Sequence, residues 1–185
     1  MMRMVILAIL CISTARAEVD HSNLSADVFC MAQNIYHEAR NQSVAGQYAV
    51  GLVVLNRKAD GRFPHSVCGV TTQGQHKRSW RDKKILVPIR NRCHFSWYCD
   101  GMSDAIHDMK RWSYIVRLSK YILSGKRLLD ITDGATHYHA TYILPDWAES
   151  KTETARIDDH IFYRWEKRAI DIEREKILRK EGKIP

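Results

Sequence analysis

The feature that most constrains the fold is a pair of consecutive helical patterns near the start of the chain. Ser25 can cap a first helix that runs to about Arg40, in which apolar side chains recur at helical spacing. Ser43 can cap a second helix that continues through Arg57. Glycines within this second helix, Gly51 among them, lower its helix propensity and predict close packing against a neighbouring element.

The first helix ends on the segment Asn34–Arg40, which places a carboxylic acid, Glu38, just before the turn-like residues 41–43. A carboxylate there meets the negative end of the helix dipole and loses part of its hydration, and both effects favour its protonated form. These conditions make a general acid. The local sequence also fits a surface glutamate at a helix end, so both interpretations stay open at this point.

The remaining pattern predicts a mainly helical α+β domain, with a small sheet inserted between three or four helices. Extended segments are expected at 67–73, 93–99, 135–142 and, as a strand or turn, 157–163. Further helices are expected from Ser103 to Ser124 and from Trp165 to Lys180. Residues 74–92 carry seven Lys or Arg and few apolar positions, which predicts a basic surface loop.

Residues 1–17 have the pattern of a secretory signal peptide. Arg3 precedes an eight-residue apolar run, and the small residues Ala15 and Ala17 mark a cleavage site. The run is too short to span a bilayer, so we expect a secreted or periplasmic protein without a permanent membrane anchor. The mature chain would then comprise one folded domain over 18–164, followed by a charged helix and tail over 165–185.

The cysteine pattern agrees with export. Four cysteines remain after the signal peptide, an even number in a chain that would meet an oxidising compartment: Cys30, Cys68, Cys93 and Cys99. No two of them have the two-residue spacing of a zinc knuckle, so we predict two disulfide bonds, and the spacing leaves all three pairings open.

The net charge and the sequence motifs exclude some classes of function but do not identify one. The formal net charge is +8 for the whole chain and +6 once Arg3 and Arg16 are removed with the signal peptide. Such a charge suits cell wall material, nucleic acid or a membrane surface, without choosing among them. The chain has neither a Gly-rich phosphate loop nor a Gly-x-Ser-x-Gly elbow, so a nucleotide enzyme or a serine hydrolase gains no support.

A protonated Glu38 could donate its proton to a glycosidic oxygen. Hydrolysis usually needs a second carboxylate, and the candidates are Asp82, Asp100 and Asp133. Alternatively, the same carboxyl group acts first as acid and then as base toward a hydroxyl of the sugar, which gives an anhydro product. Flat aromatic side chains suited to stacking on a sugar are Phe95, Trp97, Tyr98, Tyr138 and Tyr142. Trp97 and Tyr142 also fit positions in the core.

A histidine pair offers the competing chemistry. His137 and His139 would point to the same side of a strand and could share a zinc ion, completed by His160 or Asp158. The dipeptide at 37–38 does not extend to a His-Glu-x-x-His motif, because residue 41 is Asn.

Several separated segments together resemble the SleB-type cell wall hydrolases, the family of spore-cortex-lytic enzymes and their relatives in Gram-negative bacteria and phages. The matching segments are 34–40, 46–50, 54–57, 63–64, 67–70, residue 73, 95–101, 135–140 and 161–163. So many separate sequence segments are improbable as chance matches in the right order.

The resemblance implies a lysozyme-like fold and cleavage of the β-1,4 bond between muramic acid and glucosamine in peptidoglycan by lytic transglycosylation, with Glu38 as acid and then base. It implies a glycan groove lined by Gln73, Phe95, Ser96, Thr136 and Tyr138. We expect no cofactor and no metal, glycan strands and not nucleic acid as the partner, and a monomer.

The resemblance also points to a bridge between Cys68 and Cys99, where the spore enzymes can lack cysteine, which would leave Cys30 with Cys93. The chain departs from the family in the basic insertion after Gln73 and in the charged helix near its end. Two alternatives to a glycan-cleaving enzyme stay open, namely a zinc-dependent peptidoglycan amidase and a wall-binding module without turnover.

Overall fold

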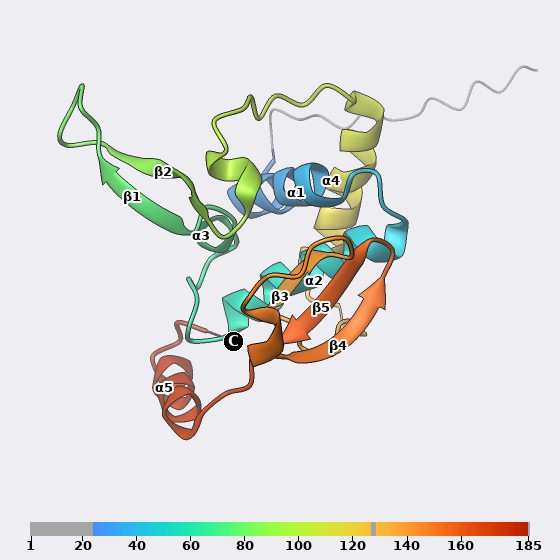
Figure 1. Ribbon diagram of the computed structural model, residues 1–185, viewed down its shortest axis with the longest axis vertical. Helices are drawn as coiled ribbons and strands as arrows, with labels where there is room; N and C mark the ends of the chain where they lie inside the picture. Colours follow the sequence, from blue (N-terminus) through green and yellow to red (C-terminus); the bar gives the residue numbers. More distant parts are fainter. Residues whose placement is uncertain (1–23, 127–128, 185) are drawn as a thin grey trace, which may run out of the picture.

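The body of the protein is built around one central helix, α2 (Val44–Ala59). A computed structural model describes residues 24–126 and 129–184, so the predicted signal peptide lies outside the described residues. Helices pack on one side of α2 and an antiparallel sheet packs on the other (Figure 1). More than half of the residues of this helix are buried. The predicted α+β class with a small sheet is confirmed.

The helical side consists of α1 (Ala26–Ala39), α3 (Val67–Thr71) and α4 (Met109–Leu123). The hydroxyl oxygens of Ser25 and Ser43 accept hydrogen bonds from backbone N–H groups in the first turns of α1 and α2, as predicted. The predicted close packing of the second helix is also confirmed, because a Cβ atom on Gly51 would lie 2.6 Å from Cδ1 of Ile122 on α4. This side of the core includes Met31, Ile35, Val50, Val54, Ile115 and Val116.

The sheet side consists of three antiparallel strands in the order β3-β5-β4. Their bounds are His137–Ala140 for β3, Thr152–Ile157 for β4 and His160–Arg164 for β5. Tyr138 pairs with Phe162 across β3 and β5. The ring of Phe162 is fully buried against Ala49 and Val53 of α2. This contact fixes β5 over the central helix, and backbone pairing with β5 holds β3 beside it.

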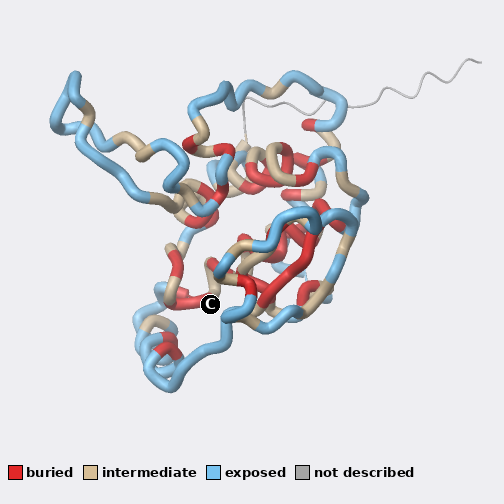
Figure 2. The backbone as a smooth tube through the Cα atoms, viewed as in Figure 1, coloured by how far each residue is buried: buried red, intermediate tan, exposed pale blue. Residues whose placement is uncertain are grey.

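The remaining elements of the described residues are a hairpin, two short 3₁₀ helices and a C-terminal helix. An antiparallel hairpin of β1 (Gly74–Arg78) and β2 (Leu86–Cys93) projects from the body and is largely exposed (Figures 1 and 2). The short 3₁₀ helices are η2 (Ser96–Cys99) and η3 (Ala148–Ser150). Helix α5 (Ala169–Lys180) begins four residues later than the sequence predicts. Among the described residues, no helix combines the length and the apolar content needed to cross a membrane.

Residues 93–99 were predicted to be extended, and that prediction is wrong. The alternating burial of Phe95, Trp97 and Cys99 is present, but the backbone turns back on itself in η2. A disulfide between Cys93 and Cys99 holds their Cα atoms 6.1 Å apart, whereas six residues of strand would span about 20 Å. The cross-link therefore excludes the strand that the alternation suggests.

Three other segments also differ from prediction. Residues 67–71 form a short helix and not a strand, because the Ser66 hydroxyl caps it by accepting from Gly69 N–H. Residues 74–92 form the hairpin and not a loop, since the two paired strands have no fully buried face that would produce an apolar alternation. Helix α4 begins at Met109 and not near residue 103, because Asp108 supplies the cap.

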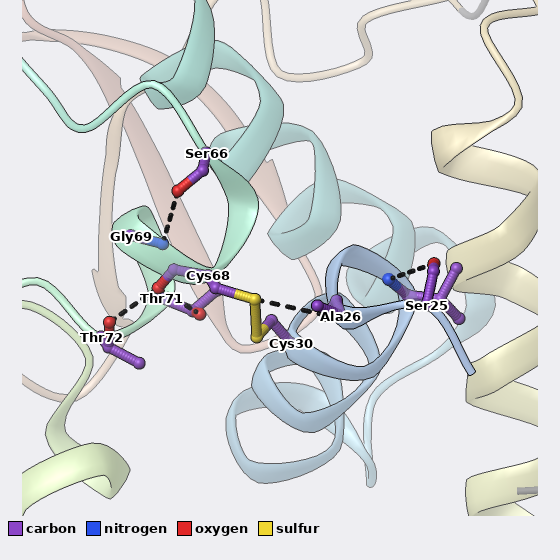
Figure 3. Close-up of a disulfide and its surroundings, with 9 residues drawn as sticks. Ser25, Ala26, Cys30, Ser66, Cys68, Gly69, Thr71 and Thr72 are labelled. Atoms are coloured by element: carbon purple, nitrogen blue, oxygen red, sulfur yellow. Dashed lines mark hydrogen bonds between the residues drawn. A yellow bond between two sulfur atoms is a disulfide. The ribbon is translucent and has the colours of Figure 1, made fainter. Parts of the chain in front are cut away.

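The described residues contain two disulfide bonds, Cys30–Cys68 and Cys93–Cys99. All four predicted cysteines are therefore paired, but the pairing of Cys68 with Cys99 and of Cys30 with Cys93 is wrong. The reason is the packing of α3 against α1, which brings Cys68 next to Cys30 (Figure 3). The turn at η2 meanwhile returns the chain to the end of β2.

The two bridges should differ in their effect on stability. The Cys30–Cys68 bridge spans 38 residues and Cys93–Cys99 spans 6, so loop-closure entropy predicts losses of about 4 and about 2 kcal/mol when each is removed as a pair of alanines. Urea unfolding of the two double variants measures this difference. The reverse order would show that loop entropy does not govern these bridges.

Candidate active site

A groove of about 980 Å³ lies where the end of α1 meets β3. Its other walls come from the segment 93–97, which includes the start of η2, and from residues 100–108, which lead into α4. The volume lies at the upper end of the range usual for ligand sites in proteins. Glu38 lines this groove from the next-to-last position of α1.

Glu38 is half-buried, and its Oε2 atom accepts a hydrogen bond of 2.9 Å from the Tyr138 hydroxyl. Desolvation raises the pKa of Glu38 above its ordinary value. The Tyr138 hydrogen bond and the positive charge of Arg57 lower the pKa, but by less than desolvation raises it. The surface-glutamate interpretation does not fit this position. The geometry instead provides a carboxyl group that keeps its proton to a higher pH than an exposed one.

A raised pKa has a consequence for stability that can be measured. Ionising a desolvated carboxyl costs free energy in the folded state, so wild-type stability should fall as the pH rises from 4.5 through the raised pKa of Glu38. Glu38→Gln cannot ionise, and we expect its melting temperature to exceed that of the wild type increasingly over this interval. Glu149→Gln, an exposed site, serves as control. A difference that stays constant between acidic and neutral pH would contradict the prediction.

The other polar side chains of Asn34–Arg40 support the groove from α1. The amide oxygen of Asn34 accepts a 3.0 Å hydrogen bond from the Trp97 indole N–H. The Tyr36 hydroxyl accepts from the backbone N–H groups of His107 and Asp108, which holds the wall that leads into α4. One turn of helix thus positions two walls and the carboxyl group between them.

Arg57 is the main feature that the sequence analysis did not single out as a site residue. It lies at the groove with 5% of its surface exposed, and its guanidinium lies over the rings of Phe95 at 4.8 Å and Phe63 at 5.4 Å. Its Nε–H donates to the Thr136 carbonyl at 2.6 Å. Nη1 has no hydrogen-bond partner among the described residues. Desolvation lowers the pKa of Arg57 to about 10, so it carries a positive charge at neutral pH.

The structure brings together some of the predicted groove residues. Phe95, Ser96 and Tyr138 line the groove with Glu38. Gln73 and Thr136 are not among its lining residues. Thr136 is buried, with its hydroxyl 2.9 Å from Nδ1 of His137, and it lines a second depression near α5. Gln73 lies between α3 and β1, and its backbone carbonyl accepts from the His94 N–H. Their part in substrate binding stays a prediction.

The remaining aromatic candidates differ in how far their side chains are exposed. The Tyr142 side chain is 82% exposed at the rim of the groove, where it could stack on a sugar. Trp97 also lines the groove but is buried, stacked on the His37 ring with centroids 5.0 Å apart. Tyr98 is partly buried against the helical core.

Of the three candidates for a second carboxylate, only one lines the groove. Asp100 lines the groove, together with Asp104 and Asp108, which the sequence analysis did not consider. Oδ1 of Asp100 accepts from the Met102 N–H at 2.7 Å. The other two candidates lie elsewhere, since Asp82 is in the turn of the hairpin and Asp133 pairs with Arg164 at 2.7 Å.

The histidine pair is engaged in the sheet. His139 Nε2 lies 2.9 Å from the Tyr163 hydroxyl and its Nδ1 lies 2.9 Å from the Ala140 carbonyl. His137 is packed among aromatic rings, where desolvation lowers its pKa to about 3. Within 24–126 and 129–184, no three side chains of His, Cys, Asp or Glu gather as a metal site would require. The geometry therefore does not favour the zinc amidase alternative.

Comparisons with known proteins agree with this architecture. The chain is 29% identical over 137 residues to a spore cortex-lytic enzyme of Halalkalibacterium halodurans. The matched region covers 74% of this chain and 34% of that protein. It is 46% identical over 44 residues to the spore cortex-lytic enzyme of Bacillus subtilis, covering 24% of this chain and 14% of that protein. The matches thus span about a third or less of these relatives.

Two solved structures share the fold. One is the catalytic domain of the germination-specific lytic transglycosylase SleB from Bacillus anthracis, with a TM-score of 0.51, 20% identity and coverage of 79% of this chain and 100% of that one. The other is the catalytic domain of SleB from Bacillus cereus, with a TM-score of 0.51, 21% identity and coverage of 82% and 100%.

The family model for cell wall hydrolases matches residues 41–163, which is about two thirds of the chain. The matched region contains most of the groove, including Arg57, Phe95 and Tyr138. It begins three residues after Glu38, so the assignment of Glu38 depends on the geometry of the groove. The chain belongs to the cell wall hydrolase family.

Proposed function

We propose that this protein cleaves the β-1,4 bond between N-acetylmuramic acid and N-acetylglucosamine in peptidoglycan, by lytic transglycosylation, outside the cytoplasm. The observation that carries the proposal is a half-buried carboxyl group with a raised pKa that lines a groove of about 980 Å³. Family membership and the activity named for the SleB domains support the same conclusion.

In the first step, protonated Glu38 donates its proton to the glycosidic oxygen. The bond between that oxygen and C1 of the muramic sugar breaks, and the electron pair stays with the departing glucosamine oxygen. C1 is left with oxocarbenium character. A raised pKa keeps the required proton on Glu38 to a higher pH than an exposed glutamate would allow.

In the second step, the Glu38 carboxylate takes the proton from the C6 hydroxyl of the same sugar. The C6 oxygen then bonds to C1, which closes a 1,6-anhydro ring and restores protonated Glu38. The carboxylate that exists between the two steps is stabilised by the Tyr138 hydrogen bond and the Arg57 charge. One carboxyl group therefore serves both steps, and water is not consumed.

Substrate binding follows from the composition of the groove. Tyr142 at the rim offers an aromatic face to a sugar ring, and Ser96 offers a hydroxyl to its polar groups. We propose that Phe95 contributes indirectly, since its ring contacts the Arg57 guanidinium. The protein would act as a monomer on glycan strands.

Product analysis tests the proposal directly. Purified sacculi are digested and the soluble fragments are analysed by mass spectrometry, in the presence and absence of a strong chelator. We expect muropeptides with anhydro-muramic ends in both cases. Reducing ends that carry solvent oxygen would indicate hydrolysis, and cleaved peptide stems that disappear with chelator would indicate an amidase.

A further inference from the structure

The hairpin formed by β1 and β2 is not explained by the chemistry of the groove. Residues 74–92 contain seven Lys or Arg against one Asp, a net charge of +6, whereas the whole chain has a net charge of +8. Most of the net charge is therefore concentrated in one projecting element (Figure 1). A charge placed this way directs the hairpin, and not the whole body, toward an anionic surface.

Apolar side chains lie at the same end of the hairpin as these charges. Trp80 is 78% exposed, Leu86 is 63% exposed and Ile85 is 54% exposed. Arg78 pairs with Leu86 across the strands, so a cation and an apolar side chain lie side by side. The exposed basic residues that surround the tip are Lys77, Arg78, Arg81, Lys83 and Lys84.

The tip has a defined conformation. Ser79 N–H donates to the Ile85 carbonyl at 2.8 Å, and Arg78 Nη1 donates to the Lys83 carbonyl at 2.7 Å. The guanidinium of Arg81 lies over the Trp80 ring, 5.0 Å from its centroid. The bonded turn presents its apolar residues to the outside instead of burying them.

The base of the hairpin is fixed to the body. The Cys93–Cys99 bridge joins the end of β2 to η2, and Arg90 Nε–H donates to the Asp100 carbonyl at 2.9 Å. The tip is therefore held away from the body by a short, cross-linked stalk (Figure 2).

We propose that the hairpin tip docks reversibly on the surface of a phospholipid bilayer that contains anionic lipids. Lys and Arg are attracted to anionic headgroups, while Trp and aliphatic side chains partition into the boundary between headgroups and acyl chains. A hydrated polyanion of the cell wall would satisfy the charges but would leave Ile85 and Leu86 in water. A bilayer surface satisfies both, so the observations favour lipid over a wall polymer.

Vesicle sedimentation tests this proposal with the full chain. Phosphatidylcholine vesicles with and without phosphatidylglycerol are compared, and we expect binding to the anionic vesicles that weakens as salt is raised. Lys83→Glu/Lys84→Glu should weaken binding at least about 30-fold, because each basic residue at an anionic surface contributes roughly fivefold. Trp80→Ala should weaken it about tenfold through lost apolar burial.

Lys120→Glu/Lys126→Glu makes the same change of charge at the far end of α4 and serves as the matched control, which should bind within about threefold of the wild type. If both double variants bind equally, another part of the chain, such as the apolar run at 5–12, carries the binding and the proposal is overturned. The proposal is also overturned if the wild type does not bind anionic vesicles but binds sacculi, and Lys83→Glu/Lys84→Glu weakens that binding to sacculi. Neither result depends on the chemistry of Glu38.

Discussion

Glu38→Gln should reduce the release of soluble muropeptides from purified sacculi at least about 1,000-fold, because general acid and general base catalysis each contribute 10²- to 10⁴-fold and one group supplies both. The amide cannot donate a proton to the glycosidic oxygen or remove one from the C6 hydroxyl. It keeps nearly the same shape, so the hydrogen bond with Tyr138 can persist through the amide oxygen.

Three measurements separate this prediction from its alternatives. The Glu38→Gln variant should sediment with sacculi as the wild type does, because the substrate-facing residues are unchanged. Glu149→Gln, the exposed control, should keep full turnover. A Glu38→Gln variant that retains more than a tenth of the wild-type rate would show that the proton comes from another group, and Asp100 and Asp104 of the same groove would be tested next.

Tyr138→Phe should slow turnover about 10- to 100-fold, the range that corresponds to losing one hydrogen bond to a charged group. The bond is needed most when Glu38 is a carboxylate, between proton donation and proton removal. The same substitution removes a contribution that lowers the pKa of Glu38, so its pKa should rise further. The alkaline limb of the pH–rate profile should therefore move to higher pH.

The direction of that shift distinguishes a catalytic contact from simple packing. Lost packing alone would lower the rate at every pH and leave the limb in place. Tyr121→Phe, which removes the hydroxyl of a half-exposed tyrosine at the end of α4, should change neither the rate nor the profile. A shift of the alkaline limb to lower pH in Tyr138→Phe would contradict the role assigned to the hydrogen bond.

The elements that could be predicted from the sequence are those with local signals. Ser25 and Ser43 identified the starts of α1 and α2, because a capping hydroxyl acts on its own first turn. The hairpin could not be predicted, because neither strand has a fully buried face and no apolar alternation marks them. The turn at η2 was missed because it depends on a cross-link between Cys93 and Cys99 that spacing alone could not assign.

The residues of the candidate site also differ in whether the sequence alone could identify them. Glu38 could be proposed from its position at a helix end, and Tyr138 from the resemblance to a family. Arg57 was not proposed as a site residue, because its importance depends on Phe63 and Phe95, which approach it only in the fold. The family resemblance included residues 54–57, but a single arginine at a helix end has many possible roles.

The central position of α2 has a consequence for how this protein unfolds. One side of the helix contributes Val50 and Val54 to the core shared with α1 and α4, and the other contributes Ala49 and Val53 to the core under the sheet. Residues adjacent in the chain thus belong to different cores. Loss of either core would expose the apolar side chains on one side of α2 to water. The helical core and the core under the sheet should therefore unfold together in a single cooperative thermal transition.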